Sequence, residues 1–374
     1  MRWMATLLVS FCLALPVLPA TAATPLRASL VPAQPLVERT RDGQSLNFDL
    51  MFANDGARAL ELTRLELTVL DRDGRFFAQR RLDRNGDSST MSILTLPNRT
   101  LPANGRLVVF NPFPRFPADA WLGDLRYEAT FRVGNDGPEQ TVAMRVAPRP
   151  FAPATRLTLP LRGEVFVHDG HDLLAHHRRL DITGDLTTHF GITGNFMRYA
   201  HDFTVADAQG RLYRNDGATP QDWYGYGTPI LATADARVAE THDGMPDNHR
   251  GGPPAFTQDE IMRNLKLFLG NYVLLDHGNG EYSLFAHMQQ GSVRVQPGQR
   301  VARGERIGAM GMSGDAFLVH LHYQLQSGPG FEEGLPAYFH DVRVRTGNGW
   351  SATYDGPVDS GDMVEGIAES TQVP

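Results

Sequence analysis

The sequence predicts a mostly β protein with two β-rich parts, and three observations support this. Residues 24–146 consist of short runs in which apolar and polar side chains alternate, separated by turn-forming residues. Residues 147–155 are rich in proline, which stiffens the backbone and is typical of a linker. Beyond this linker the chain becomes rich in histidine, glycine and aromatic residues, and short strands resume. We therefore expect one domain at 24–146, a second at 156–350 and a C-terminal tail at 351–374.

The first 22 residues have the features of a secretory signal peptide. Arg2 precedes an apolar stretch that is shorter than the ~20 residues of a membrane span, and the small residues Ala20-Thr21-Ala22 follow it. We expect an exported protein, periplasmic or extracellular, that retains no membrane span. The only cysteine, Cys12, lies in this segment. The processed chain is therefore expected to have no disulfide, no catalytic thiol and no thiolate metal site.

The charge of the chain argues against a nucleic-acid partner. The formal net charge is −7, and the single lysine is Lys266. Proteins that bind nucleic acid normally present a basic face, which this composition does not favour. The sequence contains no indication of the oligomeric state.

The N-terminal domain is predicted to be an immunoglobulin-like β-sandwich. Alternating runs predict strands at residues 45–52, 65–70, 107–110 and 127–133, and Arg72-Asp73-Gly74 is typical of a hairpin turn. A length of roughly 100 residues fits such a sandwich. Because no cluster of His, Asp and Glu stands out in it, we interpret this domain as a spacer or docking unit.

The second domain is also predicted to be built from short strands. Strand candidates lie at residues 196–205, 229–238, 271–276, 282–287 and 320–326, and glycines between them indicate tight turns. One helix is expected over Thr257–Phe268, because Thr257 and Glu260 have the spacing of a capping box.

The pair His320-Leu321-His322 is the strongest candidate for chemistry. On a strand, residues i and i+2 point to the same face, so both imidazoles would face one site. Such a pair allows one histidine to bind zinc while the other faces a metal-bound water.

Several segments around this pair carry a family resemblance. In order, the chain has Gly227-Thr228-Pro229, His277-Gly278-Asn279-Gly280, Ala286-His287-Met288 and a series of glycines from Gly298 to Gly314. With the His pair, these segments resemble the lysostaphin-type (LytM-like) zinc endopeptidases over roughly residues 198–326, although Met288 replaces the usual leucine. The resemblance implies an antiparallel β-barrel or sandwich hybrid with a groove, one Zn²⁺ ion, and hydrolysis of peptide bonds in bacterial cell-wall peptidoglycan.

The resemblance also implies roles for individual residues. His322 matches a zinc ligand, and His320 and His287 match two histidines that hold the water and steady the developing oxyanion. Asp202 matches an aspartate ligand, four residues after a position where the family usually has a zinc-binding histidine. This chain has Arg198 there, which cannot bind a cation.

An exported branch of the family has a similar Arg-Tyr-Ala-x-Asp-Phe segment, preceded by a loop that bears histidines. In this chain, His177 and His189 are the two candidates for the missing zinc ligand, and the sequence does not decide between them.

Two functions remain open at this point. The first is a zinc endopeptidase that acts on cell-wall crosslinks, which His287, His320 and His322 favour because a scaffold has no need of them. The second is a non-catalytic relative that activates or scaffolds other wall hydrolases, which Arg198 favours. The glycine pattern also resembles lipoyl and biotin carrier domains. Those carriers need a lysine at a hairpin tip, and Lys266 lies in the predicted helix, so we exclude them.

Overall fold

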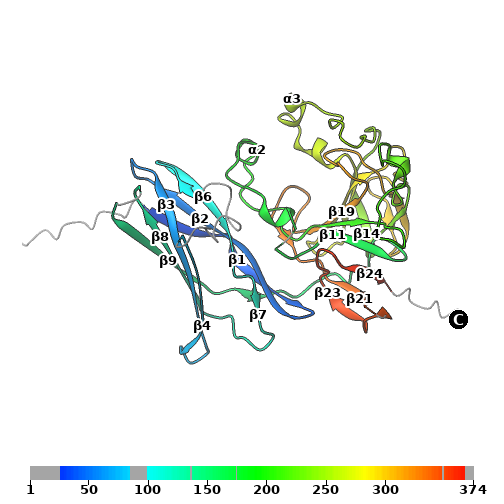
Figure 1. Ribbon diagram of the computed structural model, residues 1–374. Coiled ribbons are helices and arrows are strands. Elements are labelled where there is room, and N and C mark those ends of the chain that lie inside the picture. The colour runs from blue at the N-terminus through cyan, green and yellow to red at the C-terminus, as the bar shows by residue number, and fades with distance from the viewer. Residues whose placement is uncertain (1–25, 85–98, 135–136, 174, 348, 367–374) are drawn as a thin grey trace, which may run out of the picture.

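The computed structural model describes residues 26–84, 99–134, 137–173, 175–347 and 349–366, which fold into two β-rich parts (Figure 1). The predicted signal peptide and residues 367–374 of the predicted tail lie outside the described residues. Among the helices that are described, none has the length and apolar character needed to cross a membrane.

The N-terminal part consists of two stacked sheets, which we call the N-terminal sandwich. Its first sheet joins β10 (Arg149–Pro150), β1 (Leu26–Thr40), β2 (Gly43–Asn54) and β6 (Gly105–Phe110), with β7 (Arg115–Phe116) on β2. Its second sheet joins β4 (Phe76–Asp83), β3 (Leu60–Leu70), β8 (Leu125–Arg132) and β9 (Glu139–Val146), with β5 (Thr100–Leu101) on β3.

The predicted N-terminal strands are confirmed, and their alternation builds the core. Phe48 and Leu50 of β2 pack against Leu65 and Leu67 of β3, with every second side chain turned inward. Strand β10, within the segment predicted as a linker, pairs in parallel with β1.

The C-terminal part contains one large sheet whose neighbouring strands are antiparallel. Its order is β17 (Arg300–Val301), β14 (Ala236–His242), β15 (Asn271–Asp276), β16 (Tyr282–Met288), β19 (Leu321–Gln326), β12 (His201–Thr204), β11 (Val165–Asp169), β24 (Met363–Gly366), β21 (Phe339–Thr346) and β22 (Gly349–Trp350). Strand β20 (Gly334–Leu335) pairs with β19, and β23 (Tyr354–Gly356) pairs with β21.

The extent of the large sheet differs from the sequence prediction in two ways. The predicted barrel is wrong for the described residues, because the end strands β17 and β22 do not pair with each other and the sheet stays open. Strand β17 has only two residues and pairs with β14 alone, so it offers little edge for closure. Where a C-terminal tail is predicted from residue 351, β23 and β24 are strands of the sheet.

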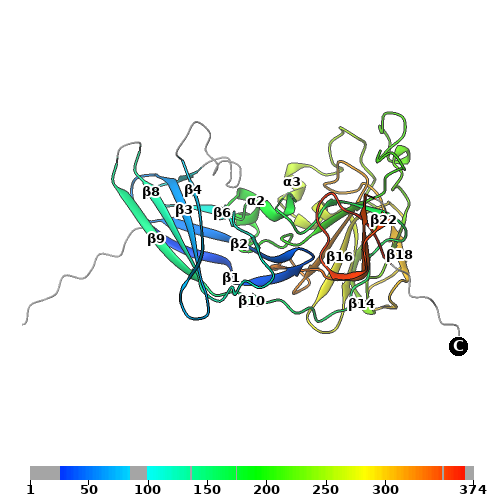
Figure 2. The same ribbon diagram turned by 60° about the horizontal axis from the view of Figure 1, so that its bottom comes forward.

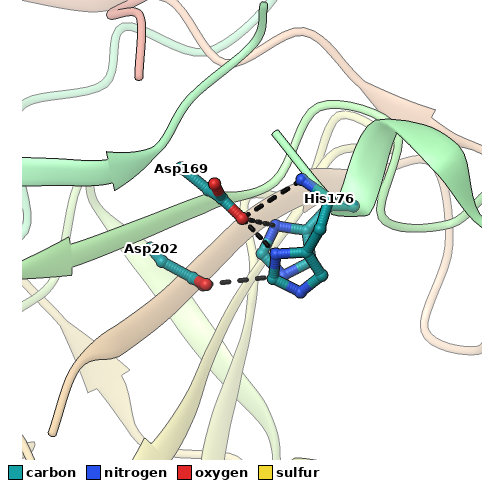
Figure 3. Close-up of side chains that lie close together, drawn as sticks. Asp169, His176 and Asp202 are labelled. Carbon is teal, nitrogen blue, oxygen red and sulfur yellow. Dashed lines mark hydrogen bonds and ion pairs between the residues drawn. The ribbon is translucent and has the colours of Figure 1, made fainter. Parts of the chain in front are cut away.

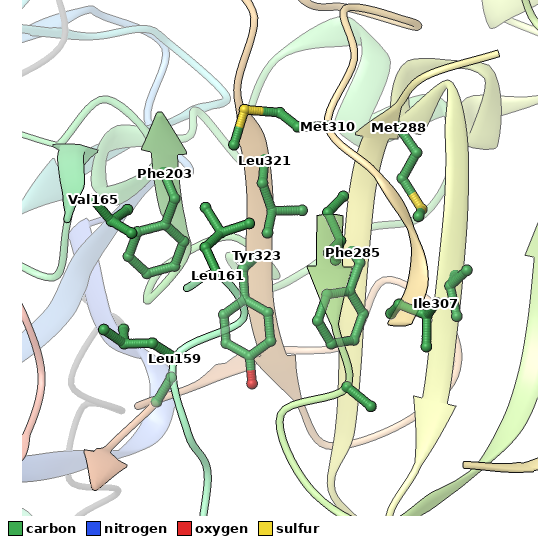
Figure 4. Packing of buried hydrophobic residues seen from close by; sticks show 14 of the residues in the cluster. Leu159, Leu161, Val165, Phe203, Phe285, Met288, Ile307, Met310, Leu321 and Tyr323 are labelled. Carbon is green, nitrogen blue, oxygen red and sulfur yellow. The ribbon is translucent and has the colours of Figure 1, made fainter. Parts of the chain in front are cut away.

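A small second layer covers the sheet and closes the core. Strands β13 (Pro229–Leu231) and β18 (Arg306–Ala309) form this layer, and Ile307 belongs to the same buried cluster as Phe203, Phe285 and Tyr323 of the large sheet (Figure 4). Because these aromatic side chains occupy the core face, their strand neighbours in sequence point to the opposite face.

The described helices are short. They are η1 (His177–Arg179), α2 (Asp185–His189), η2 (Pro220–Asp222), α3 (Gln258–Ile261) and η3 (Leu265–Leu269). Thr257 and Glu260 form the predicted capping box, but the predicted helix divides into α3 and η3. The break occurs at Asn264, whose backbone is extended and whose side chain accepts a hydrogen bond from the Lys266 amide.

Candidate metal centre

Asp202 and His322 face each other across two neighbouring strands. They are directly opposite in the register of β12 and β19, and Nδ1 of His322 lies 3.2 Å from Oδ1 of Asp202. Both side chains are buried. Phe203 and Tyr323 fill the core face of the same strands, so alternation turns Asp202 and His322 to the other face.

Two further histidines approach the same carboxylate oxygen. Nε2 of His320 lies 3.4 Å, and Nε2 of His177 3.6 Å, from Oδ1 of Asp202. His320 precedes β19 and shares a face with His322, as the sequence predicts, while His177 comes from the short helix η1. Three imidazole nitrogens from two segments of the chain, η1 and the start of β19, therefore surround one carboxylate.

A hydrogen bond on the side of the His320 ring away from Asp202 determines where the proton of this imidazole lies. Nδ1 of His320 lies 3.0 Å from the carbonyl oxygen of Leu318, which can only accept, so Nδ1 carries the proton. In the neutral ring Nε2 then has no proton. Burial lowers the pKa of His320, which favours this neutral form.

A chain of amides orients His322 in the same way. The Gln326 amide nitrogen donates to the carbonyls of Gly328 and Gly330, so its oxygen accepts from the amide nitrogen of Gln324. The oxygen of Gln324 must then accept from Nε2 of His322, at 2.9 Å. With the proton on Nε2, the neutral ring directs the lone pair of Nδ1 at the carboxylate.

This arrangement fits a bound cation. Burial raises the pKa of Asp202, but positive charge on the surrounding histidines lowers it well below its usual range, so the carboxylate is already ionised when these imidazoles carry protons. Lone pairs of neutral imidazoles and an ionised oxygen repel each other unless a proton or a cation lies between them. Ligands that are ~2.0–2.1 Å from a tetrahedral zinc ion lie about 3.4 Å apart. The observed separations from Asp202 of 3.2, 3.4 and 3.6 Å agree with that spacing.

His287 reaches the same face through an irregularity in β16. Between Phe285 and Met288 the pairing with β15 shifts, and His287 has a φ of +60°, which is uncommon for a non-glycine residue. Its Nδ1 donates to the Ser313 carbonyl over 2.9 Å, and its ring centre lies 4.8 Å from that of His320. Burial and the neighbouring histidines lower the pKa of His287 well below its usual range.

A second carboxylate, that of Asp169, lies near the ring of His177. Asp169 pairs with Asp202 in the register of β11 and β12, and its carboxylate accepts hydrogen bonds from the backbone and the ring of His176 (Figure 3). Nδ1 of His177 is buried without a hydrogen bond, 3.8 Å from the same carboxylate. Asp169, His176, His177 and Asp202 offer ligand atoms within 4.8 Å of one another. Sequence reasoning missed Asp169, because its place opposite Asp202 depends on a strand register that the sequence does not reveal.

Other histidines in this region do not join the site. His189 lies on α2, and its Nε2 is 2.9 Å from the Met262 carbonyl, with no contact to Asp202. His201 precedes Asp202 on β12, so its ring lies on the other face of the strand, where it stacks on Phe203.

Arg198 also points away from the site. Its guanidinium is fully buried and pairs with Asp49 of the N-terminal sandwich and with Glu333. The position where a histidine is usual therefore contributes to an interface between the two parts of the chain.

Comparisons with known proteins identify the family of part of this chain. The family model described as peptidase family M23 matches residues 222–330, which include His287, His320 and His322 but begin after His177 and Asp202. The chain is 36% identical over 92 residues to the peptidoglycan DD-endopeptidase ShyA of Vibrio cholerae, covering 24% of this chain and 21% of that protein. It is 25% identical over 151 residues to the cell division protein DipM of Caulobacter vibrioides, covering 40% of this chain and 18% of that protein.

The chain thus spans about a fifth of the length of these curated relatives. Among solved structures, the catalytic domain of lysostaphin from Staphylococcus simulans is similar at 18% identity, with a TM-score of 0.24. That match covers 46% of this chain and 87% of the lysostaphin domain.

Proposed function

This chain carries a domain of peptidase family M23, and on that premise we propose that it is a zinc-dependent endopeptidase that hydrolyses peptide crosslinks of bacterial cell-wall peptidoglycan. The observation that carries the proposal is the convergence of His177, His320 and His322 on the ionised carboxylate of Asp202. A relative named as a peptidoglycan DD-endopeptidase supports the substrate class.

Asp202, His177 and His322 form the proposed zinc-binding set. Two imidazoles and one carboxylate leave a fourth position open, which is the ligand count of a catalytic zinc site. His176 is not in this set, because its Nδ1 is engaged with Asp169 and its side chain is 54% exposed. His189 is not in it either, because it has no contact with Asp202.

His320 and His287 are the proposed catalytic residues. A zinc ion bound by the set would polarise the scissile carbonyl and lower the pKa of a bound water. His320 and His287 each donate from Nδ1 to a backbone carbonyl, which leaves Nε2 unprotonated in the neutral ring. His320 can then take a proton from the attacking water and pass it to the leaving amine, while the unprotonated Nε2 of His287 can accept a hydrogen bond from the same water.

The role of the rest of the chain is part of the same proposal. We propose an exported chain that begins after residue 22, with a sandwich at 24–146, a linker at 147–155 and a peptidase domain that begins at 156 and includes β23 and β24. The sheet orders β1-β2-β6 and β4-β3-β8-β9 support an immunoglobulin-like class for the sandwich. The signal-peptide pattern supports a periplasmic or extracellular location. N-terminal sequencing of the exported protein would show whether residues 1–22 have been removed.

The alternative of a non-catalytic activator or scaffold loses its main support. It depended on Arg198 at a ligand position, but Arg198 pairs with Asp49 and Glu333, and His177 lies near Asp202 instead. The alternative would still require a wall hydrolase as partner and no cleavage by the purified chain.

Zinc binding and cleavage by the purified protein test the proposal. We expect the chain lacking residues 1–22 to retain about one zinc per molecule, as one set of ligands implies, and to release soluble peptides from purified peptidoglycan. Metal content is measured by atomic emission, and cleavage by chromatography of the released fragments. Zinc binding without cleavage would favour the scaffold, and the absence of both after refolding with excess zinc would contradict the proposed site.

Gln324→Met should weaken zinc binding without removing a ligand. The substitution takes away the acceptor for Nε2 of His322 and so releases the tautomer that directs Nδ1 at Asp202. Loss of such an outer partner typically lowers metal affinity ~10–100-fold. Competition with a chromophoric chelator measures the affinity, and Gln296→Met at an exposed position is the matched control. Wild-type affinity in Gln324→Met would contradict the orientation assigned to His322.

A further inference from the structure

One outer face of the N-terminal sandwich is buried. In the sheet β1-β2-β6, Val109 of β6 points into the sandwich core, while its neighbour Val108 points outward. Val108 and Phe110 pack against Ile182, which belongs to the segment between β11 and β12. Figures 1 and 2 show this segment, with α2, lying between β6 and the C-terminal part. An outer sheet face of an isolated sandwich would be in water.

Asp49 lies at the centre of this buried contact. Its Oδ1 accepts from Arg178 at 3.0 Å and its Oδ2 from Arg198 at 2.8 Å, and all three side chains are fully buried. Arg178 also donates to the Asn47 side chain and to the Phe48 carbonyl, each at 3.0 Å. Every guanidinium nitrogen of Arg178 thus bonds to the sandwich.

Charge balance makes this contact dependent on each of its members. Asp49 and Glu333 together offset the charges of Arg178 and Arg198. A buried ion pair is tolerated when its partners and hydrogen bonds are complete, and removing one partner leaves an uncompensated charge in the interior. A second buried pair, between Glu38 of β1 and His171, ties the start of the same segment to the sandwich over 2.7 Å.

The segment held in this way carries a proposed zinc ligand. His177 precedes Arg178 directly in η1, with its ring near Asp202 while the Arg178 guanidinium contacts Asp49. The backbone carbonyl of His177 accepts a hydrogen bond from the Asn195 side chain at 2.9 Å. In the described part of residues 170–199, the regular elements are η1 and the five-residue helix α2. Such short helical turns have little stability of their own, so tertiary contacts must fix the position of His177.

We propose that the N-terminal sandwich completes the metal site, with Asp49 acting through Arg178 as a positioning residue for the zinc ligand His177. This inference rests on the proposed function, because it takes His177 as a ligand. It assigns the sandwich a task beyond that of a spacer: zinc affinity depends on a face of the sandwich that never touches the metal.

A pair of matched substitutions on β6 tests the proposal in the full chain. Val108→Ala and Val109→Ala remove the same atoms from adjacent, fully buried valines, but only Val108 faces the segment that carries His177. Asp49→Asn removes the charge that holds Arg178. Zinc affinity is measured by competition with a chromophoric chelator, zinc release by the rate of transfer to EDTA, and folding by thermal unfolding followed by circular dichroism.

We expect Asp49→Asn to lower zinc affinity at least about tenfold, the lower limit for an outer partner of a metal ligand, and to speed zinc release. Val108→Ala should shift both quantities in the same direction by less, and Val109→Ala should leave them at the wild-type level despite a similar loss of thermal stability. If Asp49→Asn does not fold, the two valine variants decide.

Two results would overturn the inference. Wild-type zinc affinity in folded Asp49→Asn and Val108→Ala would contradict it while leaving the proposed function intact. Equal weakening in Val108→Ala and Val109→Ala would show that general loosening of the sandwich, rather than this face, affects the metal. Absence of zinc from the wild-type protein would instead contradict the proposed function itself.

Discussion

His322→Ala is expected to abolish stable zinc binding. The substitution removes one of two imidazole ligands and leaves Asp202 and His177 facing a cavity on β19. Loss of an outer partner already lowers metal affinity ~10–100-fold, so loss of a direct ligand should lower it by more than that range. After dialysis against a weak chelator, the variant should retain no zinc by atomic emission, whereas the wild type retains about one ion, as its single ligand set implies.

His189→Ala is the matched control for this result. The structure places only one of these two histidines at the proposed zinc site. His322 faces Asp202, while His189 lies on α2 beside the Met262 carbonyl. We expect His189→Ala to retain zinc and to cleave peptidoglycan like the wild type. Full zinc occupancy in His322→Ala would show that the ligand is another residue, and zinc loss in His189→Ala would contradict the choice of His177.

The regular parts of this structure could be predicted because they repeat a simple pattern. Strands β15, β16 and β19 follow the alternating runs at residues 271–276, 282–287 and 320–326 almost to the residue. Alternation also predicts that His320 and His322 share a face, and both approach Asp202. The predicted closed barrel is wrong for the described residues, because closure depends on how the edge strands meet, which alternation does not reveal.

The irregular parts of the site could not be predicted from the pattern. His177 and His189 lie in a segment with no periodicity, so their distances along the sequence do not indicate which one approaches Asp202. His287 reaches the site only because β16 departs from regular pairing at a positive φ. The role of Gln324 depends on hydrogen bonds that continue to Gln326 and the carbonyl of Gly328.

The contact between the two parts had a weak signal in the sequence. The run Leu107-Val108-Val109-Phe110 is apolar at four consecutive positions, which is typical of a strand buried on both faces. Its outward residues Val108 and Phe110 do pack against Ile182. The buried charge of Asp49 had no such signal, since an aspartate on an outward position of a sandwich strand is ordinarily solvated.

His320→Ala is expected to abolish cleavage while leaving zinc in place. His320 has an unprotonated Nε2 in its neutral form, and burial lowers its pKa, so it can act as a general base near neutral pH. Loss of a general base typically lowers the rate by about 100–10,000-fold. Turnover of purified peptidoglycan should fall within that range, with zinc content and thermal stability close to those of the wild type.

Measuring zinc and cleavage together separates the roles of the two neighbouring histidines. Nε2 of His320 lies 3.4 Å from Oδ1 of Asp202, almost as near as Nδ1 of His322 at 3.2 Å, so distance alone does not divide them. The two rings differ in the nitrogen that points away from Asp202. In His322 this is Nε2, held by the amide chain from Gln324, and in His320 it is Nδ1, held by the Leu318 carbonyl. If His320→Ala lost its zinc, His320 would be a ligand. If it kept both zinc and cleavage within tenfold of the wild type, another group would be the base, and His287 would be the next candidate.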